Sequence, residues 1–187
     1  MVEPTDVHAR PAERVAELVV HLGTAEVVAW CAGLLAGDTA YDDPAFPSLS
    51  WLGGPHALVL LEQGDLERTG NAYWPRVWGA RGLLHAYAPE AAGEVVGALG
   101  DEAWRVREMS AKVVARWEVA DAADALEALV GDEVTRVRAA AVRALGLVGE
   151  GEHAAVVRGA QDDPEPSVRR TAAVALATMR ARLDRDV

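Results

Sequence analysis

The sequence predicts an all-α fold of repeated helical pairs, and three observations support this prediction. Residues of one type recur every 31 positions, as in the triplets Asp101, Asp132, Asp163 and Val106, Val137, Val168 and Arg107, Arg138, Arg169. Apolar residues between these positions follow helical spacing, for example Val106, Met109, Val113 and Trp117. The alternation typical of β-strands does not occur in this part of the sequence. Several positions that share one spacing indicate internal repeats rather than chance.

Each repeat is predicted to contain two helices. The first helix is expected at residues 90–99, 121–130 and 152–160, and its acidic first residue suits the positive end of a helix dipole. The second is expected at residues 104–117, 136–148 and 166–180, where many alanines favour helix and permit close packing. A helical pair of this length cannot bury its apolar face alone, so neighbouring pairs are expected to stack into a solenoid.

The repeated pattern resembles a known family. An aspartate, a Val-Arg pair that ends six residues later and a helix of small residues are similar to HEAT repeats, and the short period resembles the bacterial HEAT-like repeats of phycobilin lyases. The resemblance covers residues 74–179. It implies a right-handed α-solenoid with a period of about 31 residues. It also implies a structural ladder between adjacent repeats that is formed by Asp101, Arg107, Asp132, Arg138, Asp163 and Arg169.

The amino-terminal part of the chain follows the repeat poorly. Helices are expected at residues 7–21, 24–35 and 49–63, the last one kinked at Gly53-Gly54-Pro55. This part is also the more acidic, with a net charge of −8 before residue 71 against −3 for the remainder. We therefore expect residues 1–71 to form a helical, acidic cap and residues 72–187 to form one continuous repeat region.

Composition excludes several classes of protein. No apolar run reaches the roughly 18 residues that span a bilayer, so a membrane protein is not expected. The single cysteine, Cys31, permits no internal disulfide and indicates a reducing, cytoplasmic environment. The five histidines lack metal-ligand spacing, and no glycine-rich phosphate loop is present, so neither a metal nor a cofactor is expected. The net charge of −11 disfavours nucleic acid as the partner.

A basic stripe along the second helices is the main candidate for a binding site. It comprises Arg81, Lys112 and Arg143, which are 31 residues apart, and Arg105 and Arg136, which lie seven residues before the last two. Trp74 and Trp104 stand at helix starts beside the stripe, where an indole could stack on a ligand. The alternative is a solvated face with local ion pairs, since Glu108 can reach Lys112.

These observations favour a non-enzymatic scaffold that binds an anionic protein partner or peptide through a concave Arg/Trp-lined surface. The alternative is a DNA alkylation-repair glycosylase similar to AlkD that uses the same groove. Glu108 is the one acid that we would nominate for its catalysis, since no aspartate stands on that face. A third interpretation, a chromophore lyase, would depend on the repeat type alone, and fold does not determine function.

Overall fold

The computed structural model describes residues 3–64 and 66–184, and these residues form α-helices, short 3-10 helices and loops, with no β-strand among them. The prediction of an all-α fold is thus confirmed for the secondary structure of the described residues. The chain divides into two compact units, Met1–Val95 and Val96–Val187. The boundary that the repeat pattern predicts at residue 71, the handedness of a solenoid and its period stay predictions.

The described residues of the amino-terminal unit form the helices α1 (Pro11–Leu22), α2 (Thr24–Ala36), α3 (Ser50–Gly53), α4 (Pro55–Glu62), α5 (Trp74–Leu83) and the 3-10 helix η1 (Pro89–Ala91). Helix α6 (Ala92–Gly97) contains the boundary between the units. Helices α2 and α5 form the main contact of this unit. Their approach requires glycine, because a Cβ atom at Gly79 would lie 2.5 Å from the carbonyl oxygen of Cys31.

The helix predicted at residues 49–63 is two helices in the structure. Gly54 has a φ of +63°, a conformation that interrupts a right-handed helix and that favours glycine. Pro55 then starts α4, because its fixed φ and missing N–H suit the first position of a helix. The guanidinium of Arg14 occupies the space beside Gly54, where a Cβ would lie 2.9 Å from its Nη2.

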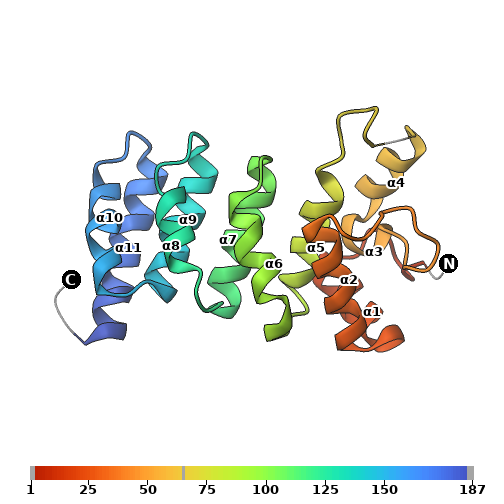
Figure 1. The fold of residues 1–187 in the computed structure, drawn as a ribbon, viewed down its shortest axis with the longest axis horizontal. Helices are drawn as coiled ribbons and strands as arrows, with labels where there is room; N and C mark the ends of the chain where they lie inside the picture. Colours follow the sequence, from red (N-terminus) through yellow and green to blue (C-terminus); the bar gives the residue numbers. More distant parts are fainter. Residues whose placement is uncertain (1–2, 65, 185–187) are drawn as a thin grey trace. The chain divides into compact units, whose positions relative to one another are not determined.

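The carboxy-terminal unit consists of helical pairs, and its elements are η2 (Ala98–Gly100), α7 (Trp104–Trp117), α8 (Ala123–Leu129), α9 (Thr135–Val148), η3 (Gly151–His153), α10 (Ala154–Gly159), η4 (Ala160–Asp162) and α11 (Pro166–Leu183). Helices α7, α9 and α11 begin 31 residues apart and lie side by side in that order (Figure 1). Helix α8 packs on α9, and α10 packs on α11. Val106, Val137 and Val168 are fully buried at equivalent positions of the three long helices.

The first helix of each pair is shorter than the sequence predicts. Asp121 has a φ of +59°, so it belongs to the turn, and α8 begins two residues later. In the last pair a 3-10 turn precedes α10 and another follows it, so the helix expected at residues 152–160 is interrupted at both ends. Local turn geometry, rather than apolar spacing, sets these ends.

Candidate functional site

Residues at the start of α7 and α9 form a compact cluster in the carboxy-terminal unit. The half-buried Trp104 ring has the guanidinium carbon of Arg105 at 4.3 Å and that of Arg136 at 5.5 Å from its centroid. Both distances are within the range of cation–π attraction. Because Arg105 belongs to α7 and Arg136 to α9, one indole holds basic groups from two neighbouring helices together.

Glu108 is the charged residue at the base of this cluster. Glu108 is only 6% exposed, and its Oε1 accepts hydrogen bonds from Lys112 Nζ at 2.8 Å and from Arg136 Nε at 3.0 Å. A buried carboxylate with two cationic partners is held by charge-assisted hydrogen bonds. Glu108 therefore offsets part of the positive charge that the sequence predicts along the stripe, and it also fixes Lys112 and Arg136 in position.

Arg143 completes the basic set on α9. Its side chain is exposed, and it has no hydrogen-bond or ion-pair partner within residues 3–64 and 66–184. We call Trp104, Arg105, Lys112, Arg136 and Arg143 the Trp104 surface. These five residues contribute four cationic side chains, and Glu108 offsets part of the charge of Lys112 and Arg136, in a chain whose overall charge is −11.

The other two predicted site residues, Trp74 and Arg81, lie in the amino-terminal unit. The centroid of the Trp74 ring lies 4.4 Å from that of His56 in a T-shaped arrangement and 5.7 Å from that of Trp78 in a stacked arrangement. Arg81 is half-buried; burial lowers its pKa, and the nearby positive charge of Arg14 lowers that pKa further. Trp74 thus contributes to an aromatic cluster within its own unit.

The repeated Arg and Asp residues form ion pairs between consecutive helical pairs of the carboxy-terminal unit. Arg107 Nε lies 2.7 Å from Asp132 Oδ2, and Arg138 Nε lies 2.7 Å from Asp163 Oδ2. Each aspartate also accepts a hydrogen bond from the backbone N–H two residues later, at 2.8 Å in both cases. Each arginine therefore pairs with the aspartate of the following repeat, while that aspartate shapes the turn before its own second helix.

The pair between Arg138 and Asp163 changes the protonation equilibria of both groups. The hydrogen bond to Arg138 is the main reason why the pKa of Asp163 is lowered, and the same bond raises the pKa of Arg138. These groups are stable in their charged forms, as expected for a structural ion pair.

Two buried polar residues were not predicted as important from the sequence. Arg14 is 3% exposed, and it donates to the backbone carbonyls of Trp51 at 3.1 Å and Val7 at 3.2 Å, and also to Ala9 O. Burial lowers its pKa. The one signal in the sequence is that Arg14 stands on the apolar face of α1 with Val15 and Leu18.

His153 is the second such residue. It is 3% exposed, its Nδ1 accepts a hydrogen bond from the Glu150 N–H at 3.0 Å, and its Nε2 lies 3.2 Å from Asp124 Oδ1. With Nδ1 as acceptor, Nε2 carries the proton of the neutral ring and donates to Asp124. His153 thus links α8 to the 3-10 turn before α10, a contact between side chains that are distant in sequence.

The described residues contain no group of three or more His, Cys, Asp or Glu side chains arranged to hold a metal ion. Cys31 is buried in α2, and burial raises the pKa of its thiol to about 12. None of the helices within residues 3–64 and 66–184 has the length and apolar character to cross a bilayer.

Comparison with known proteins identifies the repeat. The family model of HEAT repeats matches residues 126–186, which begin within α8 and include α9, α10 and α11. No curated protein matches the chain. The match covers residues 126–186, and the paired helices and the Arg138–Asp163 ion pair of this segment agree with a HEAT-repeat arrangement there.

Proposed function

We propose that this chain is a non-enzymatic scaffold and that the Trp104 surface binds an acidic segment of a partner protein. HEAT repeats form helical-repeat scaffolds, and the proposal adds the surface and the chemistry of the ligand. The observation that carries it is the placement of two guanidinium groups over one indole at the start of α7 and α9.

The chemistry of this cluster suits carboxylates. A guanidinium binds a carboxylate through the N–H groups in its plane, and Arg136 already makes this kind of contact, since its Nε and Nη2 both lie 3.0 Å from Glu108 Oε1. Arg143 adds an exposed guanidinium on the same helix as Arg136. Tryptophan and arginine are also the residues that contribute most to binding energy in protein interfaces.

Glu108 acts in this proposal as a positioning residue. It is buried and bonded to both Lys112 and Arg136, so those side chains do not need to be ordered when the ligand binds. The same bonds argue against the glycosylase alternative, because the nominated carboxylate is occupied by two cations. The predicted contacts of Trp74 and Arg81 with the ligand stay predictions.

The test uses affinity capture with the full chain at moderate salt, followed by mass spectrometry and nuclease treatment. The expected result is a stoichiometric protein partner that is retained after nuclease treatment. Direct titration then compares the wild-type chain with Arg105→Ala and Arg143→Glu, and each substitution is expected to weaken binding by about tenfold or more. Arg68→Glu, at an exposed arginine of the amino-terminal unit, is the matched control and should bind normally.

Two outcomes would contradict the proposal. Unchanged affinity in Arg105→Ala and Arg143→Glu would show that the Trp104 surface is not the site. Recovery of nuclease-sensitive nucleic acid in place of a protein would favour the glycosylase alternative. The titrations would then use a short DNA duplex as the ligand instead of the protein.

A further inference from the structure

Arg81, on α5, is a half-buried cation without a partner. It makes no hydrogen bond and no ion pair with the residues that the structure describes. Its nitrogens still reach the surface, since the fully buried side-chain atoms without a hydrogen bond in this part of the chain belong to Trp78, Glu94 and Ser110. A guanidinium in this position has lost part of its hydration and has gained no bond within the fold in return.

The buried guanidinium of Arg14 is held at the end of α3 by backbone oxygen atoms. Its Nε donates to Trp51 O at 3.1 Å and its Nη2 to Leu52 O at 3.4 Å, while Nη1 donates to two carbonyls of the segment before α1. The exposed Asp6 raises the pKa of Arg14, but burial, which lowers that pKa, is the larger effect. The fold therefore fixes a positive charge at this point, and no described carboxylate is bonded to it.

The packing of α5 on α3 brings Arg81 to the same point. A Cβ added at Gly53 would lie 2.7 Å from Trp78 Cε2, and a Cβ added at Gly54 would lie 2.9 Å from Arg14 Nη2. Trp78 and Arg81 are three residues apart, so they share one face of α5. Two consecutive glycines thus contact this face of α5 and the Arg14 guanidinium. The charge of Arg14 accordingly lowers the pKa of Arg81, in addition to the larger effect of burial.

The start of α4 adds positive potential beside the two arginines. Gly54, which contacts Arg14, is the residue that precedes this eight-residue helix. The amino-terminal end of a helix carries a partial positive charge, and its first N–H groups have no partner within the helix. The first turn of α4 contains no acidic residue, and no side chain caps it. The helix end and both guanidinium groups therefore favour an anion at one place.

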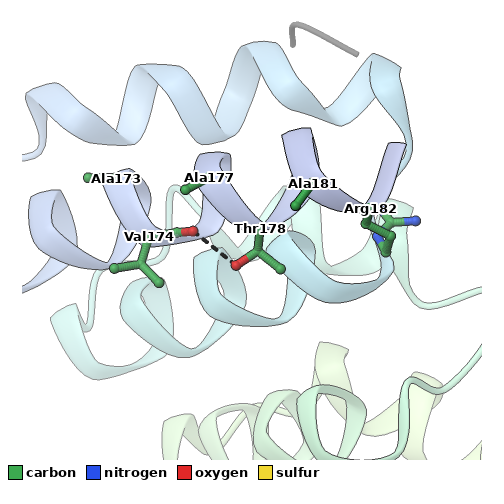
Figure 2. A pocket seen from close by; sticks show the side chains of 6 residues that line it. All are labelled: Ala173, Val174, Ala177, Thr178, Ala181 and Arg182. Atoms are coloured by element: carbon green, nitrogen blue, oxygen red, sulfur yellow. Dashed lines mark hydrogen bonds between the residues drawn. The ribbon is translucent and has the colours of Figure 1, made fainter. Parts of the chain in front are cut away.

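Arginines of the other compact unit show what Arg81 lacks. Arg138 is paired with Asp163, and Arg182, which lines a shallow open pocket along α11 (Figure 2), lies 3.4 Å from Glu150 Oε1. A shortage of acids does not explain the difference, because the chain before residue 71 has a net charge of −8. The carboxylates of this acidic region are placed elsewhere, and an anion from outside the chain would supply the missing partner of Arg81.

We propose that Arg81 binds a phosphate group, which lies between its guanidinium and the fixed positive charges of Arg14 and of the α4 amino terminus. We call Arg14, Gly54 and Arg81 the Arg81 site. A phosphate group carries a charge of about −1.5 to −2 at pH 7, so it matches two guanidinium groups better than a carboxylate does. Arg81 supplies the free N–H donors, and Arg14 supplies charge. A free phosphate compound and a phosphorylated side chain both present this chemistry.

The inference goes beyond the proposed function. The Arg81 site lies in the amino-terminal unit, whereas the residues of the Trp104 surface belong to the carboxy-terminal unit. The two proposals use different arginines and different ligands, so either can fail without the other.

The experiment follows thermal unfolding of the full chain in rising concentrations of inorganic phosphate, with sodium chloride adjusted to keep the ionic strength constant. Phosphate also stabilises folded proteins in general, because it is excluded from their surfaces. The informative quantity is therefore the difference between the wild-type chain and Arg81→Gln. We expect a saturable rise in Tm for the wild-type chain and an apparent Kd that is weaker by at least about tenfold in Arg81→Gln.

Two controls make the result specific. Arg68→Gln removes the same charge at an exposed position of the amino-terminal unit, and it should respond to phosphate as the wild-type chain does. In sodium chloride alone, Arg81→Gln should unfold at the same temperature as the wild-type chain or at a higher one, because the substitution removes a half-buried charge that has no partner.

A further titration identifies the source of the phosphate. N-acetyl-O-phosphoserine amide is compared with inorganic phosphate on the wild-type chain and on Arg81→Gln. Tighter binding of the phosphoserine compound, dependent on Arg81, assigns the site to a phosphorylated side chain. Tighter binding of inorganic phosphate assigns it to a free phosphate compound.

Three outcomes would overturn the inference. The first is that phosphate raises the Tm of the wild-type chain and of Arg81→Gln equally. The second is that acetate at equal concentration produces the same Arg81-dependent rise, which would make a carboxylate the ligand. The third is that Arg81→Gln unfolds at a clearly lower temperature in sodium chloride alone, which would show that Arg81 already has a partner within the fold.

Discussion

Nε and Nη2 of Arg138 donate to the two carboxylate oxygens of Asp163 at 2.7 and 3.0 Å. This bidentate pair connects α9 to the loop that precedes α11, over 25 residues of sequence. Arg107 and Asp132 form the corresponding pair one repeat earlier, again at 2.7 Å. Because only 12% of the Arg138 side chain and 8% of the Asp163 side chain are exposed, water screens this pair less than a pair on the open surface.

The first prediction is that Arg138 and Asp163 are energetically coupled. Arg138→Ala, Asp163→Ala and the double variant are compared by urea unfolding monitored by circular dichroism. We expect a coupling free energy of about 1–2 kcal/mol, since removal of one partner leaves the other charge poorly solvated. Additive single effects would show that the pair contributes little beyond its separate backbone hydrogen bonds.

The second prediction concerns the pH dependence of the same pair. Arg138 lowers the pKa of Asp163 in the folded state, so the unfolded chain binds the proton at higher pH than the folded chain does. The stabilisation by this ion pair is therefore fully present above the pKa of about 3.9 that Asp163 has in the unfolded chain. It is lost as the pH falls through the lower pKa that Asp163 has in the folded chain.

Unfolding free energies of the wild-type chain and Asp163→Asn, measured from neutral pH to pH 3, test this prediction. The difference between the two proteins should be constant near neutral pH and should shrink on the acid side. A difference that grows towards low pH would contradict the sign of the pKa shift.

The third prediction concerns the contact between α9 and α11. Gly146→Ala is expected to destabilise the chain by about 1–3 kcal/mol, although alanine favours helix, because the new Cβ would lie 2.8 Å from a backbone atom of Ala175. Gly159→Ala is the matched control, since an added Cβ there would meet no described atom within 4 Å outside the neighbouring residues and backbone of its own helix, and its φ is −56°.

Thermal unfolding of the two variants measures this difference. Gly159→Ala should stabilise the chain by about 0.5–1 kcal/mol through reduced freedom of the unfolded state. If Gly146→Ala were equally stabilising, α11 could not lie as close to α9 as the structure places it.

The fourth prediction concerns Cys31. Its thiol is buried against Gly82, and burial raises its pKa to about 12, so the native protein should react with a thiol reagent at pH 8 only through unfolding. Reaction should be immediate in denaturant.

The raised pKa of Cys31 also makes stability depend on pH. The neutral thiol stabilises the fold below the pKa of about 8.5 that Cys31 has in the unfolded chain, and this contribution decreases as the pH rises towards 12. Rapid labelling of the native protein would contradict the burial of Cys31.

Much of the fold could be predicted from residues alone. The recurrence of Asp132 and Asp163 and of Val137 and Val168, with alanine-rich segments between them, was enough to predict helical pairs, and the match to HEAT repeats lies in this same region. Helical spacing is a local property, so it can be observed in one sequence without any knowledge of long-range contacts. The ends of the short helices were predicted less well, because they depend on single turn residues such as Asp121 with its φ of +59°.

The candidate site was predicted only as a set of residue types. The sequence places Arg105, Lys112 and Arg136 on one helical face, but an open basic stripe and an ion-paired face have the same spacing. The structure shows Glu108 bonded to two of these cations and Trp104 beside two guanidinium groups. It also places Trp74 and Arg81 in the other compact unit, where Trp74 packs with His56 and Trp78.

The sequence by itself determined that this chain is α-helical and repetitive, because the 31-residue recurrence and the helical spacing of apolar residues are both properties of the order of residues. Only the tertiary structure decided which charges are paired and which are exposed. Arg138 and Arg169 are indistinguishable by their position in the repeat, yet one is bonded to a carboxylate of the next helical pair and the other is exposed on α11. The physical reason is that an ion pair depends on the distance between atoms from different helices, and stacking of the helices sets that distance.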